Sequence, residues 1–409
     1  MNLSPSATSQ TARRQKAPLR HRLGPVLPAL PMLAFLALFL VVPLAIIGKT
    51  ALSDPEVSAA LPQALAYAAD GVPDDAGFAA LVADLVEAKK AGLMRPLARR
   101  LEYGVAGGSA AVTDLARIAD AELAAQDPAA IRLAVTGSNP IWSQPGIWQA
   151  IDQGAAPWSL FYLKWALGVP VKATPDGQPA SDGIHDFGTI YLRTIVISLL
   201  VTGLTVVIGY PLAYVVATSS GMIGKVLIFL VLLPFWTSLL VRTMSWIVVL
   251  QKNGVMNDLL LAGGLTAEPL PLLYTRFATI LAMVQIQLPF TVLPMISVMR
   301  AIPPSHVRAA RSMGAGPVSA HVSVFMPQAV PGIAAGALLT FVLCLGFYLT
   351  PALVGGPGDQ MVSFFIARFT NEQLNWGLAS ALSLVLIAGA TVIALPLSRY
   401  VFRHSSGRF

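Results

Sequence analysis

The residue types that carry enzyme chemistry do not form a recognisable constellation in this sequence. A phosphate-binding loop needs the pattern G-x-x-x-x-G-K-[ST], because backbone amides hold the phosphate and the hydroxyl holds magnesium. The nearest stretch, GMIGKV at residues 221–226, has the wrong spacing and lacks the hydroxyl. The patterns H-E-x-x-H and G-x-S-x-G are absent as well. We therefore predict a non-catalytic chain.

Metal and redox chemistry are not indicated either. The single cysteine, Cys344, lies in an apolar run, and the five histidines are dispersed along the chain at positions 21, 185, 306, 321 and 404. A lone cysteine cannot form a disulfide within the chain, and a thiolate metal site needs several ligands at close spacing. We expect no metal and no cofactor bound by this chain itself.

Polar side chains inside apolar stretches are the candidates for a solute pathway, because groups at lipid depth must face a neighbour or a wet cavity. Arg242 is the one charge well inside these stretches, and pairing with backbone carbonyls or lipid phosphate is an equal alternative for it. The remaining candidates are Trp236, Trp246, Gln285, Gln287, Tyr348 and Thr350. The two tryptophans could instead be interfacial anchors.

A compact basic element is predicted between two apolar stretches, at HVRAARSMGAG, residues 306–316. Pro303 and Pro304 suit a helix start, where a missing amide does no harm. Gly314 can take the left-handed conformation that ends a helix, and Pro317 can begin a second one. The result is a small helix–turn–helix that could dock into a partner, with an ordinary interfacial loop as the alternative.

Composition places these residues in a membrane. The chain has 409 residues, of which 55% are hydrophobic and only 11% charged, and the mean hydropathy is +0.68. Soluble domains carry roughly 25% charged residues. Spanning helices of roughly 20 apolar residues are predicted near 25–48, 189–217, 226–250, 276–299, 332–354 and 377–400. We therefore predict an all-α integral membrane protein with six transmembrane helices.

Basic residues orient the spans. Lys and Arg concentrate in the segments that share one side if both termini are inside: Arg13, Arg14, Lys16, Arg20, Arg22, Lys225, Arg300, Arg308, Arg311, Arg399, Arg403 and Arg408. The predicted order is a cytoplasmic basic tail, a first span, an external insertion, a five-helix core with a cytoplasmic loop at 301–330, and a cytoplasmic tail (1–24, 25–49, 50–186, 187–402 and 403–409). Cleavage of the first stretch as a signal peptide is the less favoured alternative, because its apolar core is long.

The external insertion differs from the rest in charge. Residues 54–182 hold 15 of the 20 acidic residues but only 9 of the 27 Lys and Arg. The segment 74–92 predicts a helix that buries Phe78, Leu81, Val82 and Leu85, begins after Asp74 and ends before Gly92. Asp127 and Pro128 predict a second helix start. A packed cap is the favoured interpretation, and a ligand-binding domain is the alternative.

VRAARSMGAGPVSAHVSVFMPQAVPGI, residues 307–333, resembles the EAA loop of bacterial ABC-transporter permeases. Residues at the pattern's positions are Ala309, Ala310, Gly314, Pro327, Pro331 and Gly332, whereas Arg308 stands where the family has glutamate. The resemblance implies a coupling element that contacts an ATPase through Arg308, Ala309, Ala310, Gly314, Ala315 and Pro317. The arginine puts an acidic contact to the ATPase in doubt.

Three further stretches resemble the spermidine/putrescine branch of these permeases, at residues 232–260, 288–295 and 346–362. The resemblance covers 187–402 and implies a type I importer permease in a bacterial inner membrane, working by alternating access. It also implies two ATP-binding subunits that hold ATP and magnesium, a second permease subunit and an external solute-binding protein.

The identity of the solute stays open. A polycation would favour carboxylates or aromatic faces, and acids can appear near the fifth-span break in the polyamine branch. Here that stretch carries Gly346, Phe347, Tyr348 and Ala352. A polyamine or related small organic solute is expected, with an amino-acid or opine-like solute as the alternative. A membrane-anchored ligand sensor using residues 50–186 is the alternative from another functional class.

Overall fold

The computed structural model describes residues 30–69, 71–169, 186–219 and 221–405. Within these ranges the chain is helical, apart from one isolated bridge between Ser53 and Trp158. The chain divides into two units, Met1–Lys49 and Thr50–Phe409. The described residues of the first unit, 30–49, belong to the apolar helix α2, Leu30–Ala51, which is long enough to cross a membrane. The predicted N-terminal tail at 1–24 lies outside the described residues.

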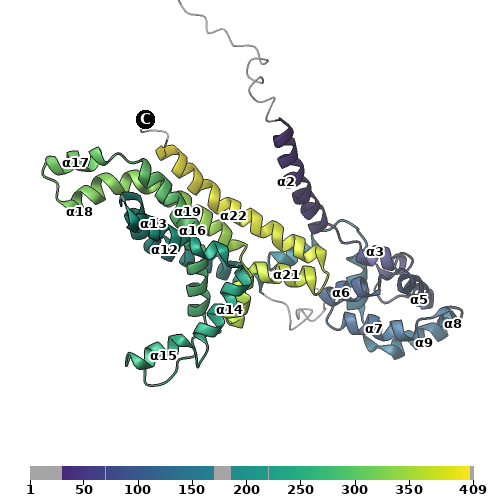
Figure 1. The fold of residues 1–409 in the computed structure, drawn as a ribbon. Helices are drawn as coiled ribbons and strands as arrows, with labels where there is room; N and C mark the ends of the chain where they lie inside the picture. Colours follow the sequence, from purple (N-terminus) through teal and green to yellow (C-terminus); the bar gives the residue numbers. More distant parts are fainter. Residues whose placement is uncertain (1–29, 70, 170–185, 220, 406–409) are drawn as a thin grey trace, which may run out of the picture. The chain divides into compact units, whose positions relative to one another are not determined.

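The insertion forms a helical body with its own apolar core (Figure 1). Its helices are α3 Glu56–Ala60, α4 Leu65–Ala68, α5 Asp75–Lys90, α6 Met94–Gly104, α7 Gly108–Ile118, α8 Ala121–Ala124, α9 Pro128–Ser138, α10 Pro145–Asp152 and α11 Phe161–Ala166, with a short 3-10 turn at Pro140–Ser143. Residues 170–185, the end of the predicted insertion, lie outside the described ranges.

Helix α5 forms where its sequence predicts. Asp74 caps it by accepting a hydrogen bond from the Gly77 amide at 3.1 Å, and Gly92 follows its end at φ +72°. The predicted apolar face is fully buried, and the Phe78 ring meets Trp148 edge-on at 5.4 Å between centroids. Helix α9 likewise begins at Pro128 after Asp127. These local predictions are confirmed.

The second part of the unit is a bundle of long apolar helices (Figure 1). Its elements are α12 Phe187–Thr218, α13 Met222–Leu232, α14 Leu239–Leu250, α15 Val255–Ala262, α16 Arg276–Ala301, α17 Pro304–Ser312, α18 Pro317–Ala320, α19 Met326–Leu345, α20 Leu349–Val354, α21 Val362–Asn371 and α22 Trp376–Ser405. Helix α16 packs between α12 and α19. In the described residues five helices could each span a membrane, and a bent pair could form a sixth span.

The predicted third span at 226–250 is wrong as one continuous helix. It is broken between α13 and α14, whose segments meet at 102°. Pro234 lacks an amide donor and lies in a 3-10 turn, Leu233–Trp236. Ser238 then starts α14 by accepting a hydrogen bond from the Val241 amide at 3.2 Å. The chain therefore bends here, because Pro234 interrupts one helix and Ser238, four residues later, caps the next.

The predicted fifth span at 332–354 has the wrong boundaries. Helix α19 begins at Met326 and ends at Leu345, and a continuous helical path runs into it from Pro317. Pro327 and Pro331, which the sequence pattern places before the fifth span, lie in the first two turns of α19. Pro327 has no amide to donate, and the π-helical turn His321–Phe325 ends just before it. Helix α19 is capped at Gly346, and the next helix, α20, begins at Leu349.

The two ends of the bundle differ. One end carries the elbow, which we define as residues 304–325, together with the C-terminal ends of α12 and α16 (Figure 1). The other end carries α21, the start of α22 and the insertion helix α11, which share one apolar cluster. The elbow and the insertion therefore lie at opposite ends of the bundle.

Candidate functional site

The elbow is a helix–turn–helix closed by local hydrogen bonds. Pro303 precedes α17 and Pro304 is its first residue. The amide of Ala315 donates to the Ala310 carbonyl at 3.1 Å, and the amide of Gly314 donates to Arg311 at 3.0 Å. This is the Schellman pattern, and Gly314 sits at φ +93°, as it requires. The predicted turn is confirmed.

The outer surface of the elbow is basic and apolar. Arg308, Ala309, Gly314 and Pro317 are exposed, and Ala315 is half-buried. Met313 is 83% exposed and Val318 is 74% exposed. Ala310, in contrast, is buried within the chain, so it offers no surface to a partner. Exposed apolar side chains beside arginines are typical of a protein contact.

Arg242, the charge singled out in the sequence, is half-buried and lies at the break in the third span. Its Nη2 atom donates to the Pro234 carbonyl and, at 3.0 Å, to the Thr237 carbonyl. The Pro234 carbonyl also accepts from the Thr237 amide at 3.2 Å, so Arg242 adds a second donor at the 3-10 turn. The structure thus matches the alternative of backbone pairing. Trp236 lies at the same bend, exposed and packed against Phe229 at 5.3 Å.

Three of the predicted pathway residues, Trp246, Gln285 and Thr350, make contacts where α14, α16 and α20 converge. The Trp246 indole Nε1 donates to Gln285 Oε1 at 3.4 Å. The Thr350 hydroxyl lies 3.1 Å from that of Thr243, and both are buried. Thr243 was missed by the sequence analysis, because a hydroxyl in a helix usually bonds its own backbone. Tyr348, between α19 and α20, is exposed.

Gln287 stands apart from these pairs. It is 1% exposed on α16, and neither its Oε1 nor its Nε2 has a hydrogen-bond partner within the described part of the chain. Buried polar atoms without partners are rare, and each calls for a physical explanation. An amide that donates and accepts is suited to a solute or to water along a pathway.

Gln287→Leu is expected to leave the stability of the protein unchanged or to raise it by up to about 1 kcal/mol, because an unpartnered amide is replaced by an apolar isostere. Loss of one hydrogen bond to a solute, about 1.4 kcal/mol, should weaken solute affinity roughly tenfold. Thermal unfolding and uptake kinetics measure the two effects. Ile286→Leu, a buried neighbour, is the control. A stability loss of about 1–3 kcal/mol would show a structural partner for Gln287 instead.

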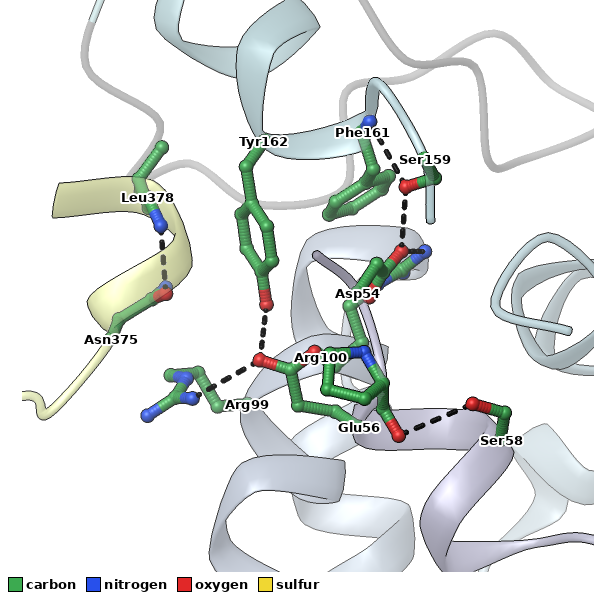
Figure 2. Close-up of polar contacts among 11 residues, drawn as sticks. Asp54, Glu56, Ser58, Arg99, Arg100, Ser159, Phe161, Tyr162, Asn375 and Leu378 are labelled. Atoms are coloured by element: carbon green, nitrogen blue, oxygen red, sulfur yellow. Dashed lines mark hydrogen bonds and ion pairs between the residues drawn. The ribbon is translucent and has the colours of Figure 1, made fainter. Parts of the chain in front are cut away.

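A second polar centre joins the insertion to the bundle (Figure 2). Asp54 accepts two hydrogen bonds from Arg100, Nε at 2.8 Å and Nη2 at 2.9 Å, and one from the Ser159 hydroxyl at 3.1 Å. Both side chains of the ion pair are 0% exposed. The guanidinium also covers the Phe161 ring, with its Cζ 3.4 Å from the centroid. The chain after α2 is thereby fastened to α6 and α11.

Glu56 and Arg99 extend this centre to the turn before α22. Glu56 Oε1 accepts from the Tyr162 hydroxyl at 2.8 Å and lies 3.6 Å from Arg99 Nη2 (Figure 2). Burial raises the pKa of Glu56 above its ordinary value. Arg99 Nη1 donates to the carbonyls of Gln373 at 2.9 Å and Leu374 at 3.0 Å. The insertion is thus held on the α21–α22 turn.

This junction was missed in the sequence analysis. The paired residues are separated by 46 positions in the Asp54–Arg100 pair and by 274 in the Arg99–Gln373 contact. A sequence signal existed in the adjacent arginines at 99 and 100 within an otherwise acidic segment. It could not identify their partners. In the described residues no group of three or more His, Cys, Asp or Glu side chains is placed to hold a metal.

The bundle is the part of the chain that matches known proteins. Residues 206–405 match the family described as the binding-protein-dependent transport system inner membrane component. The chain is 32% identical over 204 residues to the spermidine/putrescine transport system permease protein PotB of Haemophilus influenzae, covering 49% of this chain and 71% of that protein. It is 34% identical over 219 residues to the inner membrane ABC transporter permease protein YdcU of Escherichia coli, covering 48% and 67%.

Among solved structures, a bacterial alginate ABC transporter in complex with its alginate-bound periplasmic protein matches at a TM-score of 0.44 and 20% identity, over 54% of this chain and 80% of that one. The family match begins within α12 and leaves out the insertion. From the extent and identity of the sequence matches, this multi-pass membrane chain belongs to the inner-membrane permease components of binding-protein-dependent ABC importers, in the branch that contains the spermidine/putrescine permeases.

Proposed function

We propose that this chain forms one half of the solute pathway of an ATP-driven importer and that its elbow docks with separate ATPase subunits. The observation that carries the proposal is the elbow itself, a rigid Schellman-closed hairpin with exposed Met313 and Val318 at one end of the bundle. Closure of two ATPases would move the elbow and drive alternating access. ATP and magnesium would be bound by those subunits.

The proposed orientation places the elbow and both termini in the cytoplasm and the insertion outside. Its support is that the elbow and the insertion lie at opposite ends of the bundle. Arg300, Arg308 and Arg311 are at the elbow end, as the positive-inside rule requires of a cytoplasmic end. A second permease subunit and an external solute-binding protein complete the proposed assembly.

The proposed solute is a polyamine, as in the name of the related PotB protein. Aromatic faces and amide oxygens suit a protonated amine through cation–π attraction and hydrogen bonding. Trp246, Gln285 and Gln287 supply such groups on α14 and α16. An amino-acid or opine-like solute is the competing assignment and is separated from a polyamine by the experiment below.

The test is reconstitution of the chain in proteoliposomes together with a purified second permease subunit, the ATPase subunits and the solute-binding protein. We expect ATP-dependent uptake of radiolabelled putrescine or spermidine that requires the binding protein. Uptake of octopine or of an amino acid, with none of putrescine or spermidine, would overturn the polyamine assignment and keep the importer. Failure of any ATPase subunit to co-purify with the chain would overturn the coupling role.

A further inference from the structure

The elbow joins α19 through a π-helical turn, His321–Phe325. In this turn the amide of Met326 donates to the His321 carbonyl, five residues back. Such turns are rare and are found most often at functional sites, because a widened turn costs helical hydrogen bonding. Here the turn lies directly between the elbow hairpin and the long helix α19, and it places His321 against α12.

His321 forms a specific link to α12. Its Nε2 atom lies 2.9 Å from the Tyr210 hydroxyl, 111 residues earlier in the chain. The imidazole stacks on the Phe325 ring at 5.4 Å and 16°, and it meets the Tyr214 ring edge-on at 4.6 Å. Tyr210 and Tyr214 are one helical turn apart on α12, so both face the same imidazole. Three aromatic rings and one hydrogen bond fix the orientation of this side chain.

A second contact fixes the other arm of the elbow. His306 Nδ1 on α17 lies 2.9 Å from Gln328 Oε1 on α19. Gln328 Nε2 in turn donates to the Val324 carbonyl in the π-helical turn at 2.7 Å. Beneath these groups, Phe325 and Ala329 pack in one apolar cluster with Ala213 and Val216 of α12. Hydrogen bonds and apolar packing therefore hold the hairpin and the π turn against the C-terminal half of α12.

We propose that His321 is a positioning residue whose link to Tyr210 makes the elbow and the C-terminal half of α12 move as one body. A force applied at the elbow then reaches α12 directly, in addition to the covalent path through α19. The link is a property of this chain alone. Only the origin of the force, a docked ATPase, rests on the proposed function.

The test measures the distance between the elbow and α12 by pulsed electron paramagnetic resonance. Spin labels are attached to Met313→Cys and Val207→Cys, both at exposed positions, while Cys344 is buried and stays unlabelled. We expect a narrow distance distribution that keeps its mean when ATP and vanadate are added to the assembly. Tyr210→Phe removes the hydrogen bond and should broaden the distribution, and His321→Ala, which also removes the ring, should broaden it further.

Tyr191→Phe is the matched control, because Tyr191 lies near the other end of α12 and donates to the Leu382 carbonyl at 2.9 Å. It should leave the distribution unchanged. His321→Phe keeps an aromatic ring but not the hydrogen bond, so it should behave as Tyr210→Phe does. A distribution as narrow in Tyr210→Phe and His321→Ala as in the parent would overturn the proposal. A mean label-to-label distance in the parent chain that shifts when ATP and vanadate are added would overturn it as well.

Transport supplies a functional readout of the same link. Putrescine uptake per ATP hydrolysed is expected to fall at least threefold in Tyr210→Phe and to stay at the parent level in Tyr191→Phe. If no ATPase co-purifies with the parent chain, the coupling role fails, but the distance measurement on the chain alone still decides the link. The two failures are thus distinguishable.

Discussion

Asp54→Ala is expected to destabilise the insertion by about 3–5 kcal/mol, because it leaves the Arg100 guanidinium buried without its carboxylate. The pair is fully buried and doubly hydrogen-bonded. The measurement is chemical unfolding of the full-length protein followed by tryptophan fluorescence. Trp142 and Trp148 are buried in the core of the insertion and report on it.

Glu87→Ala is the control for this prediction, because Glu87 pairs with Lys90 on the exposed surface of α5. Exposed pairs contribute at most about 1 kcal/mol. The double variant Asp54→Leu/Arg100→Met removes both charges and should recover much of the loss, since replacement of a buried pair by apolar side chains is often neutral. A change below about 1 kcal/mol in Asp54→Ala would show that the junction is hydrated.

Ala309→Trp is expected to abolish stable co-purification of the ATPase subunits. Ala309 is the exposed alanine of the elbow, and a large ring there prevents close approach of a docked surface. Overpacking of a tight contact costs about 1–3 kcal/mol, which weakens affinity by roughly five- to 150-fold. Binding of purified ATPase subunits to the detergent-solubilised chain measures this effect, and ATP-dependent uptake should fall in parallel.

Ala110→Trp is the matched control, since Ala110 is an exposed alanine on α7 of the insertion. It should leave ATPase binding at the parent level. Normal ATPase binding in Ala309→Trp would exclude docking at this face of the elbow. Arg308→Glu introduces the glutamate of the EAA loop pattern at its position and is expected to preserve binding. Complete loss of binding in that variant would show that Arg308 has an acidic partner of its own.

The elbow and helix α5 could be predicted because their determinants are local. The Schellman bonds at Gly314 join residues three and five positions apart, and the Asp74 cap joins residues three apart. Hydrogen bonds of this range depend on residue type and backbone conformation alone, which the order of amino acids specifies. The apolar face of α5 follows from helical spacing in the same way.

The bend in the third span was not predicted from hydropathy, since the stretch is apolar on both sides of the break. Only the folded chain shows that Ser238 starts a new helix and that Arg242 donates to the backbone carbonyls at the bend. Trp236 accordingly lies at the bend against Phe229, whereas Arg242 and Trp246 are one turn apart on α14 and make different contacts. A hydropathy profile reports how favourably a stretch of residues transfers into lipid, so it cannot show where a helix bends.

Sequence alone determined that this chain is a helical membrane protein, that helix α5 and the turn of the elbow form where they do, and which family it resembles. Tertiary structure decided that Arg100 meets Asp54, that Arg99 holds the turn before α22 and that His321 meets Tyr210. The physical reason is distance along the chain. Local hydrogen bonds and apolar spacing are encoded within a few residues, whereas these contacts exist only after separate helices have packed and buried their polar groups against each other.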